Sequence, residues 1–89
     1  MPKGYTLDIT NNAFKFLESL ESKQCKQVAL KTLSLLRDSY PNDSEQLHGP
    51  KKYRRVDIGE YRIIYDVNDN VVSILAIGPR NDGKVYRGF

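Results

Sequence analysis

The chain has 89 residues, of which 39% are hydrophobic, and it carries a formal net charge of +3. This length supports one domain with one modest core, so we expect a single domain over residues 1–89. No apolar run approaches the length of a transmembrane helix, and the first residues lack the apolar stretch of a signal peptide. The composition therefore indicates a cytoplasmic protein without membrane association.

The positive charge lies in the C-terminal part of the chain. Residues 1–50 carry six Lys/Arg and six Asp/Glu, whereas residues 51–89 carry eight Lys/Arg and five Asp/Glu. The second part thus accounts for the whole net charge. Such an excess favours an acidic partner, either a nucleic acid or an acidic protein.

The N-terminal half predicts a strand followed by two helices. Alternation over residues 5–9 predicts the strand, after which Thr10 or Asn11 caps a helix. Ser22 caps a second helix that runs to about Ser39, and the short connection predicts an antiparallel helix hairpin. The expected buried stripes are Ala13, Phe16, Leu17 and Leu20 on the first helix, and Cys25, Val28, Ala29, Leu33 and Leu36 on the second.

The C-terminal half predicts a sheet. A long loop over residues 41–52 precedes it. Strands are expected over residues 53–58, 61–67 and 71–77, with Asn and Asp providing the turn at 68–70. A short last segment follows over 84–87. We therefore expect an α+β domain in the order β-α-α-β-β-β(-β). Its antiparallel sheet carries both helices on one face and leaves the other face open.

Basic side chains are expected on that open face. Alternation places Arg55 and Arg62 there on adjacent strands, Arg80 leaves the end of the next strand, and Tyr86 follows shortly after. These four side chains suit a phosphate and a base and are our candidate catalytic residues. The alternative is that they are ordinary charges on an exposed face. The basic excess also supplies candidate RNA-binding residues, namely Lys51, Lys52, Arg54, Lys84 and Arg87.

Other kinds of site find little support. A single cysteine, Cys25, and a single histidine, His48, do not make a zinc site. We find neither a glycine-rich phosphate loop followed by lysine nor a Ser-His-Asp arrangement that spacing would support. We accordingly expect neither a metal nor a cofactor.

Two motifs resemble those of the RelE/ParE superfamily of bacterial toxins. Tyr61-Arg62-Ile63-Ile64-Tyr65 resembles the "YR-apolar-apolar-Y" strand of that superfamily. Gly78-Pro79-Arg80 and Val85-Tyr86-Arg87 resemble its "GxR…VY(R)" ending. The basic strand before Gly59, the order of the elements and the size of the chain also agree, so the resemblance covers the whole chain.

The resemblance to RelE members implies a RelE-like fold and the toxin of a type II toxin–antitoxin system. Such toxins are ribosome-dependent endoribonucleases that cleave mRNA and inhibit translation without a metal. A ribose 2′-OH attacks the adjacent phosphate, which gives a cyclic phosphate and a 5′-OH. The implied partners are the ribosome, mRNA and a RelB-like antitoxin.

The resemblance also implies residue roles. Arg62 would stabilise the phosphorane, and Arg80 would contact the phosphate and help the leaving 5′-oxygen. Tyr86 would stack on a base or join the proton transfers, and Arg55 stands where RelE members place basic residues. Guanidinium groups match a phosphorane with paired N–H donors and stay charged at any working pH.

The sequence departs from the family pattern at the proton acceptor. Many catalytic relatives carry lysine, histidine or glutamate where this chain has Arg55, and arginine is a poor base. The remaining candidates are Lys51, Lys52, His48 and Tyr86, and spacing does not choose among them. Pro79 stands where some relatives carry a histidine. Two alternatives therefore stay open: a ParE-like inhibitor of DNA gyrase, and an inactive member that binds RNA or its antitoxin.

Overall fold

The computed structural model describes residues 5–49 and 51–80, so the last predicted segment, over 84–87, lies outside the described residues. None of the helices in this part of the chain is long and apolar enough to cross a membrane. The elements follow the predicted order, with one additional strand, β2, inside the predicted loop. They are β1 (Thr6–Ile9), α1 (Asn11–Ser19), α2 (Ser22–Ser34), β2 (Ser44–Gln46), β3 (Arg54–Ile58), β4 (Tyr61–Asn68) and β5 (Val71–Pro79).

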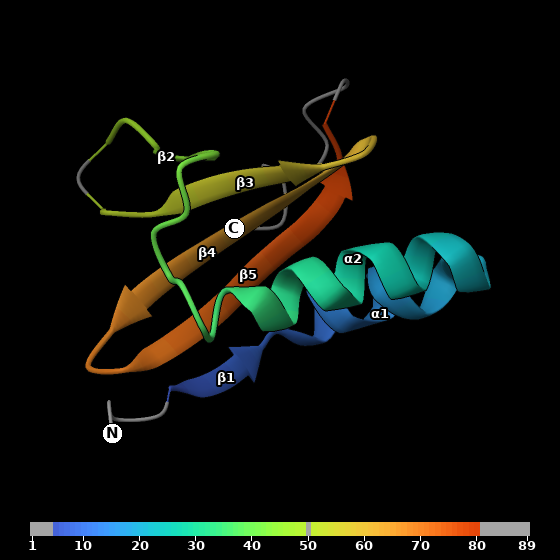
Figure 1. The fold of residues 1–89 in the computed structure, drawn as a ribbon, viewed down its shortest axis with the longest axis horizontal. Helices are drawn as coiled ribbons and strands as arrows, with labels where there is room; N and C mark the ends of the chain where they lie inside the picture. The colour runs from blue at the N-terminus through green and yellow to red at the C-terminus, as the bar shows by residue number, and fades with distance from the viewer. Residues whose placement is uncertain (1–4, 50, 81–89) are drawn as a thin grey trace.

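The strands form one sheet in the order β1-β5-β4-β3-β2 (Figure 1). Neighbours within β2–β5 are antiparallel, as predicted, but β1 pairs with β5 in parallel. The sheet is therefore mixed, and the expectation of a wholly antiparallel sheet is wrong at β1. Alternation in a sequence fixes which face a side chain takes, but it does not fix the direction of the neighbouring strand.

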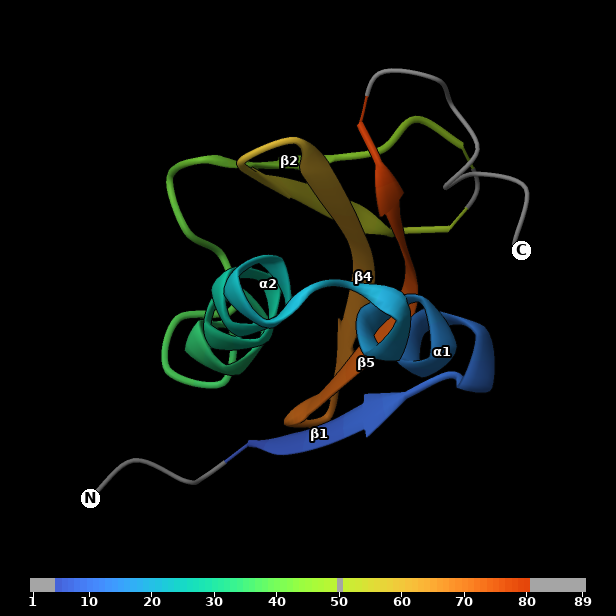
Figure 2. The same ribbon diagram turned by 90° about the vertical axis from the view of Figure 1, so that its right-hand side faces the viewer.

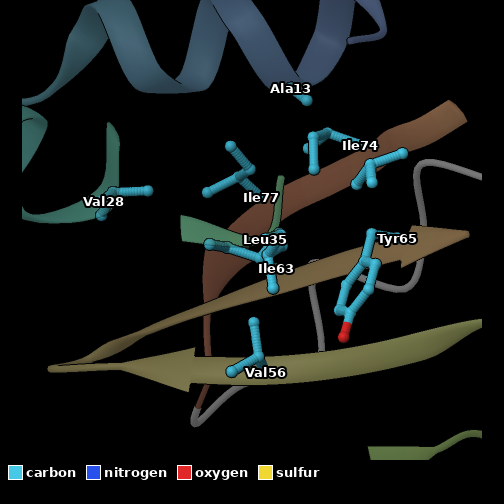
Figure 3. Close-up of a cluster of buried hydrophobic side chains, with 9 residues drawn as sticks. Ala13, Val28, Leu35, Val56, Ile63, Tyr65, Ile74 and Ile77 are labelled. Carbon is cyan, nitrogen blue, oxygen red and sulfur yellow. The ribbon is translucent and has the colours of Figure 1, made fainter. Parts of the chain in front are cut away.

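Both helices pack on the same face of the sheet (Figure 2), which confirms the predicted α+β architecture. Figure 3 shows how side chains from both helical segments and three strands meet in the layer between them. Tyr65 is the largest fully buried residue there, and its hydroxyl donates to the Ser39 carbonyl oxygen at 2.8 Å. The labelled members of this core are Ala13, Val28, Leu35, Val56, Ile63, Tyr65, Ile74 and Ile77.

The second helix ends earlier than its apolar spacing predicts. It stops at Ser34 rather than near Ser39, and the chain turns inward directly afterwards. The buried face consists of Val28, Thr32 and Leu35, which are spaced at i, i+4 and i+7, whereas Leu33, which was expected in the buried stripe, is 49% exposed. Val28 is buried as predicted.

The face opposite the helices is partly covered. Ile64 and Ala76 are buried there and form a small second cluster, against which Leu47, Tyr53 and Leu75 pack. Leu47 and Tyr53 come from the segment that leads into β3, so this segment folds over the middle of the sheet. The prediction of an open face is wrong over that part of the sheet.

Candidate functional site

The β3–β4 hairpin places an acidic and a basic side chain directly opposite each other. Gly59 has a positive φ of 58° in the short turn, and the register pairs Asp57 with Arg62. The Arg62 guanidinium donates from Nε to Asp57 Oδ1 at 2.7 Å and from Nη2 to Asp57 Oδ2 at 3.2 Å. The Arg62 side chain is only 15% exposed and that of Asp57 is 32% exposed. This pair is therefore a well-defined, half-buried feature of the sheet.

Arg80 reaches the same carboxylate from the end of β5. Its backbone N–H donates to the Glu60 carbonyl oxygen at 3.0 Å, which fixes the chain beside the β3–β4 turn. Its Nη1 lies 3.9 Å from Asp57 Oδ2. Gly78 stands opposite Arg62 in the β4–β5 register and contributes no side chain at that position. The end of β5 thus brings Arg80 and Arg62 together around Asp57.

Arg55 completes the group on the same face, two residues before Asp57 on β3. It is paired across the sheet with Glu45 of β2, and the two side chains form an ion pair. We call Arg55, Arg62 and Arg80 around Asp57 the arginine cluster. Three of the four predicted catalytic residues therefore lie close to one carboxylate, whereas the fourth, Tyr86, lies outside the described residues.

Electrostatics confirm that the three arginines act on the same group. The hydrogen bonds from Arg62 hold the pKa of Asp57 below its ordinary value of 3.8, against the opposing effect of burial. The positive charges of Arg62, Arg55 and Arg80 lower this pKa further. Asp57 is thus ionised at neutral pH, and the cluster of three guanidinium groups and one carboxylate keeps an excess of positive charge.

A surface hollow of about 220 Å³ adjoins the cluster. It opens beside β3 where the short strand β2 meets it. Polar groups dominate its wall, which includes acidic side chains as well as Arg55. Its lining residues are Asn42, Asp43, Glu45, Arg55, Val56 and Asp57.

The predicted RNA-binding residues are not gathered in one place. Arg54 lies on the helix-facing side of β3, where Nη2 donates to Ser44 Oγ at 2.8 Å and the guanidinium carbon lies 5.0 Å from the centre of the Tyr40 ring. The structure therefore separates Arg54 from the arginine cluster.

Lys51 and Lys52 are exposed in the segment before β3, and the Lys51 ammonium lies 5.8 Å from the centre of the Tyr53 ring. His48, another candidate proton acceptor, is exposed in the same segment. Lys84 and Arg87 lie outside the described residues.

Two acidic residues of the site were not predicted. Asp57 lies within the strand predicted over residues 53–58 but was given no role, and Glu45 lies within the loop predicted over residues 41–52. A signal for Asp57 was available, because the short turn at Gly59 sets it opposite Arg62. Glu45 had no comparable signal, because β2 is only three residues long and lacks an apolar alternation.

Known structures share this fold. The chain is 29% identical to RelE in an archaeal RelE–RelB complex from Pyrococcus horikoshii OT3, with a TM-score of 0.77 over 88% of this chain and 97% of that chain. It is 25% identical to a chain of the intact Escherichia coli RelBE toxin–antitoxin complex, with a TM-score of 0.73 over 86% and 98% of the two chains.

A mutant of the E. coli toxin RelE in the free state is 24% identical and gives a TM-score of 0.79 over 97% and 94% of the two chains. At that level of identity the likeness concerns the fold. Among curated protein sequences, none matches the chain.

The family that the sequence matches agrees with these structures. A family described as the ParE toxin of the type II toxin–antitoxin system, parDE, matches residues 7–83. This match spans most of the chain and includes all but the first residue of β1, both helices and the whole arginine cluster. The predicted resemblance is confirmed, and the chain belongs to the ParE toxin family of type II toxin–antitoxin systems, within the RelE/ParE superfamily.

Proposed function

We propose that this toxin is a ribosome-dependent endoribonuclease that cleaves mRNA and so inhibits translation. The observation that carries the proposal is the convergence of Arg55, Arg62 and Arg80 around Asp57 at one end of the sheet. Three guanidinium groups in one place match the charge of a phosphodiester and, still better, that of a phosphorane. The likeness of the chain to RelE structures supports the same reaction class.

In the proposed reaction, a ribose 2′-OH attacks the adjacent phosphate, and the P–O bond to the 5′-oxygen breaks. Arg62 stabilises the charge that develops on the phosphorane oxygens, and Arg80 contacts the phosphate and the leaving 5′-oxygen. Arg55 adds positive charge on the same face. Because guanidinium groups supply this charge, we propose that the reaction is metal-independent.

The proton transfers involve residues outside the arginine cluster. Tyr86 stacks on a base or takes part in the transfers, as the family resemblance implies. Lys51, Lys52 and His48 remain candidates for the group that accepts the 2′-OH proton. All three are exposed near the start of β3, so an incoming RNA strand can reach them.

We propose that a RelB-like antitoxin, the ribosome and mRNA are the partners, and that the protein acts in the cytoplasm. The antitoxin is supported by relatives that were solved as RelE–RelB and RelBE complexes. The +3 charge, which resides in residues 51–89, supports an acidic partner on the sheet side of the molecule.

A second candidate function is inhibition of DNA gyrase. The specific observation in its favour is that the matching family is described as the ParE toxin. A third candidate is an inactive member that binds RNA or its antitoxin. The poor basicity of Arg55 at the position where many catalytic relatives carry a proton acceptor also favours the gyrase inhibitor.

Primer extension on programmed ribosomes separates the endoribonuclease from the other two candidate functions. Purified toxin is added to ribosomes that carry a defined mRNA, and in parallel to the same mRNA free in solution. We expect new 5′ ends only when ribosomes are present. Intact mRNA in both reactions would reject the endoribonuclease. A gyrase cleavage assay with the same preparation would then distinguish a gyrase inhibitor, which stabilises gyrase–DNA breaks, from an inactive binding member.

A further inference from the structure

Asp57 interacts with all three arginines of the cluster. It accepts two hydrogen bonds from Arg62, at 2.7 and 3.2 Å, and lies 3.9 Å from the Arg80 guanidinium. The positive charge of Arg55, on the same strand, also lowers the pKa of Asp57. A site that binds a negatively charged phosphate thus has a carboxylate at its centre.

This carboxylate works against simple phosphate binding. It offsets one of the three positive charges of the cluster, and it repels any anion that approaches the guanidinium groups. Removing it would raise the attraction for a phosphate in the ground state. Asp57 therefore cannot contribute to catalysis through affinity for the substrate, and any contribution must come through the arrangement of the arginines.

The geometry around Arg62 is suited to such an arrangement. Arginine loses considerable rotamer entropy when it is held in one conformation, and a bidentate carboxylate fixes the plane of its guanidinium group. Here the carboxylate and the guanidinium come from directly opposed positions of two paired strands. Sites that are built on such rigid elements hold their groups more closely than sites on loops do.

Arg80 depends on the same carboxylate in a different way. Its backbone is fixed by the hydrogen bond to the Glu60 carbonyl oxygen. Its side chain is 47% exposed and has a long contact of 3.9 Å with Asp57. The charge of Asp57 thus draws Arg80 toward Arg62 while leaving it free to move onto a substrate.

We propose that Asp57 is a positioning residue, which holds Arg62 and draws Arg80 beside it in the arrangement that stabilises the phosphorane. The proposal rests on the endoribonuclease function proposed above. Positioning acts on the transition state more than on the bound substrate, so it has a kinetic signature that differs from that of a binding residue.

Kinetics on programmed ribosomes test this signature. Asp57→Asn keeps the shape of the side chain but removes its charge. We expect kcat to fall at least about tenfold, because small displacements of catalytic groups cost rate steeply, while KM is unchanged or lower. The matched control is Asp8→Asn, which makes the same change of charge on the edge strand β1, separated from β3 by β4 and β5, and which should leave both constants unchanged.

Arginine side-chain NMR tests the positioning without any activity. In the free protein, the Arg62 Nε–H should give a distinct, slowly exchanging ¹⁵N–¹H signal because it donates to Asp57. In Asp57→Asn this signal should broaden or shift, because the charged acceptor is lost. If Asp57→Asn does not fold, Asp57→Glu replaces it in both experiments, because it keeps the charge but moves the carboxylate by one carbon–carbon bond.

The outcomes separate this proposal from the proposed function. A lower kcat with an altered Arg62 signal supports both. An unchanged kcat, a raised KM alone, or an unchanged Arg62 signal would overturn the positioning role. If the parent protein cleaves no mRNA but the Arg62 signal changes in the variant, the endoribonuclease is rejected, while the result still supports the positioning of Arg62 by Asp57.

Discussion

The three arginines of the cluster differ in how firmly the structure holds them. Arg62 is mostly buried and makes two hydrogen bonds to Asp57. Arg55 is tied to Glu45 on the neighbouring strand. Arg80 is half exposed, and its side chain lies at the longer distance of 3.9 Å from Asp57. Its removal should therefore affect function far more than folding.

Replacing Arg80 with alanine tests that expectation. In Arg80→Ala, we expect ribosome-dependent cleavage to slow by about 10²–10³-fold, the usual effect of removing one electrostatic donor from a transition state. The thermal unfolding midpoint should change little. Single-turnover cleavage and circular dichroism measure the two effects. Arg37→Ala removes the same charge from an exposed position after α2 and should cleave like the parent; an equally active Arg80→Ala would exclude Arg80 from the site.

The Asp57 carboxylate also makes stability depend on pH. Its pKa in the folded protein is lowered from 3.8, chiefly by the hydrogen bonds from Arg62. A carboxyl group whose pKa is lower in the folded protein than in the unfolded protein stabilises the fold at pH values above the unfolded pKa. This contribution is lost as the pH falls through the folded pKa. The loss should therefore occur below about pH 4, near the ordinary pKa of aspartate.

Urea unfolding at two pH values checks this contribution. At pH 7, Asp57→Asn should have a lower free energy of unfolding than the parent, because the ionised pair with Arg62 is missing. At pH 3, the difference between the two proteins should be smaller. A difference that stays constant between pH 7 and pH 3 would show that the charge of Asp57 does not stabilise the fold.

At the level of elements, Thr10 joins α1 to the irregular part of β5. The β4–β5 register shifts after Ile64, so that β5 has an extra residue, Leu75. The Thr10 hydroxyl donates to the Leu75 carbonyl oxygen at 2.9 Å, and its oxygen accepts the Ala13 N–H at 3.2 Å as the N-cap of α1. The shift lets β5 turn Ile74 toward the helices while Ala76 faces the other side.

We expect Thr10→Ala to lower the free energy of unfolding by about 1–2 kcal/mol, the upper part of the range for losing an N-cap. The value should lie in that upper part because the variant also leaves the Leu75 carbonyl oxygen without this donor. Urea unfolding measures the change. Asn11→Ala, at an exposed position of the same first turn, should shift stability by less than about 0.5 kcal/mol. Equal effects of the two substitutions would contradict the role of Thr10.

The elements also show what the sequence predicts and what it does not. Period-two alternation located β3 and β4, an almost wholly apolar run located β5, and the turn at Asp69 and Asn70 has the positive φ that these residue types indicate. The parallel pairing of β1 was not predicted, because alternation carries no information on strand direction. Strand β2 was missed because its three residues, which include Glu45, show no apolar pattern.

The same reasoning explains the prediction of the site. Alternation correctly placed Arg55 and Arg62 on one face, and the end of β5 placed Arg80 near them. The position of Asp57 opposite Arg62 follows from the short turn at Gly59, but it was missed because an acidic residue among arginines was interpreted as an ordinary surface charge. The roles of Tyr86, Lys84 and Arg87 stay predictions, since these residues lie outside the described part of the chain.

On the scale of the whole molecule, the main core and the arginine cluster occupy different parts of the sheet. The helices and the inner face of the sheet form the main core, whereas the arginine cluster lies where the β3–β4 turn and the end of β5 meet (Figure 1). The net positive charge of the chain belongs to the same C-terminal part. The sheet thus carries the arginine cluster, and the helices pack on the sheet and support it.

We propose that the arginine cluster promotes the attack of a ribose 2′-OH on the adjacent phosphate. Two ribosome-bound mRNAs that differ only by a single 2′-deoxynucleotide at the mapped cleavage position test this reaction directly. We expect cleavage of the all-ribose mRNA, with a 2′,3′-cyclic or 3′-phosphate and a 5′-OH at the new ends, and no cleavage of the deoxy-substituted mRNA. Cleavage of the deoxy-substituted mRNA at that position, or new ends that carry a 5′-phosphate, would exclude the 2′-OH as the attacking group.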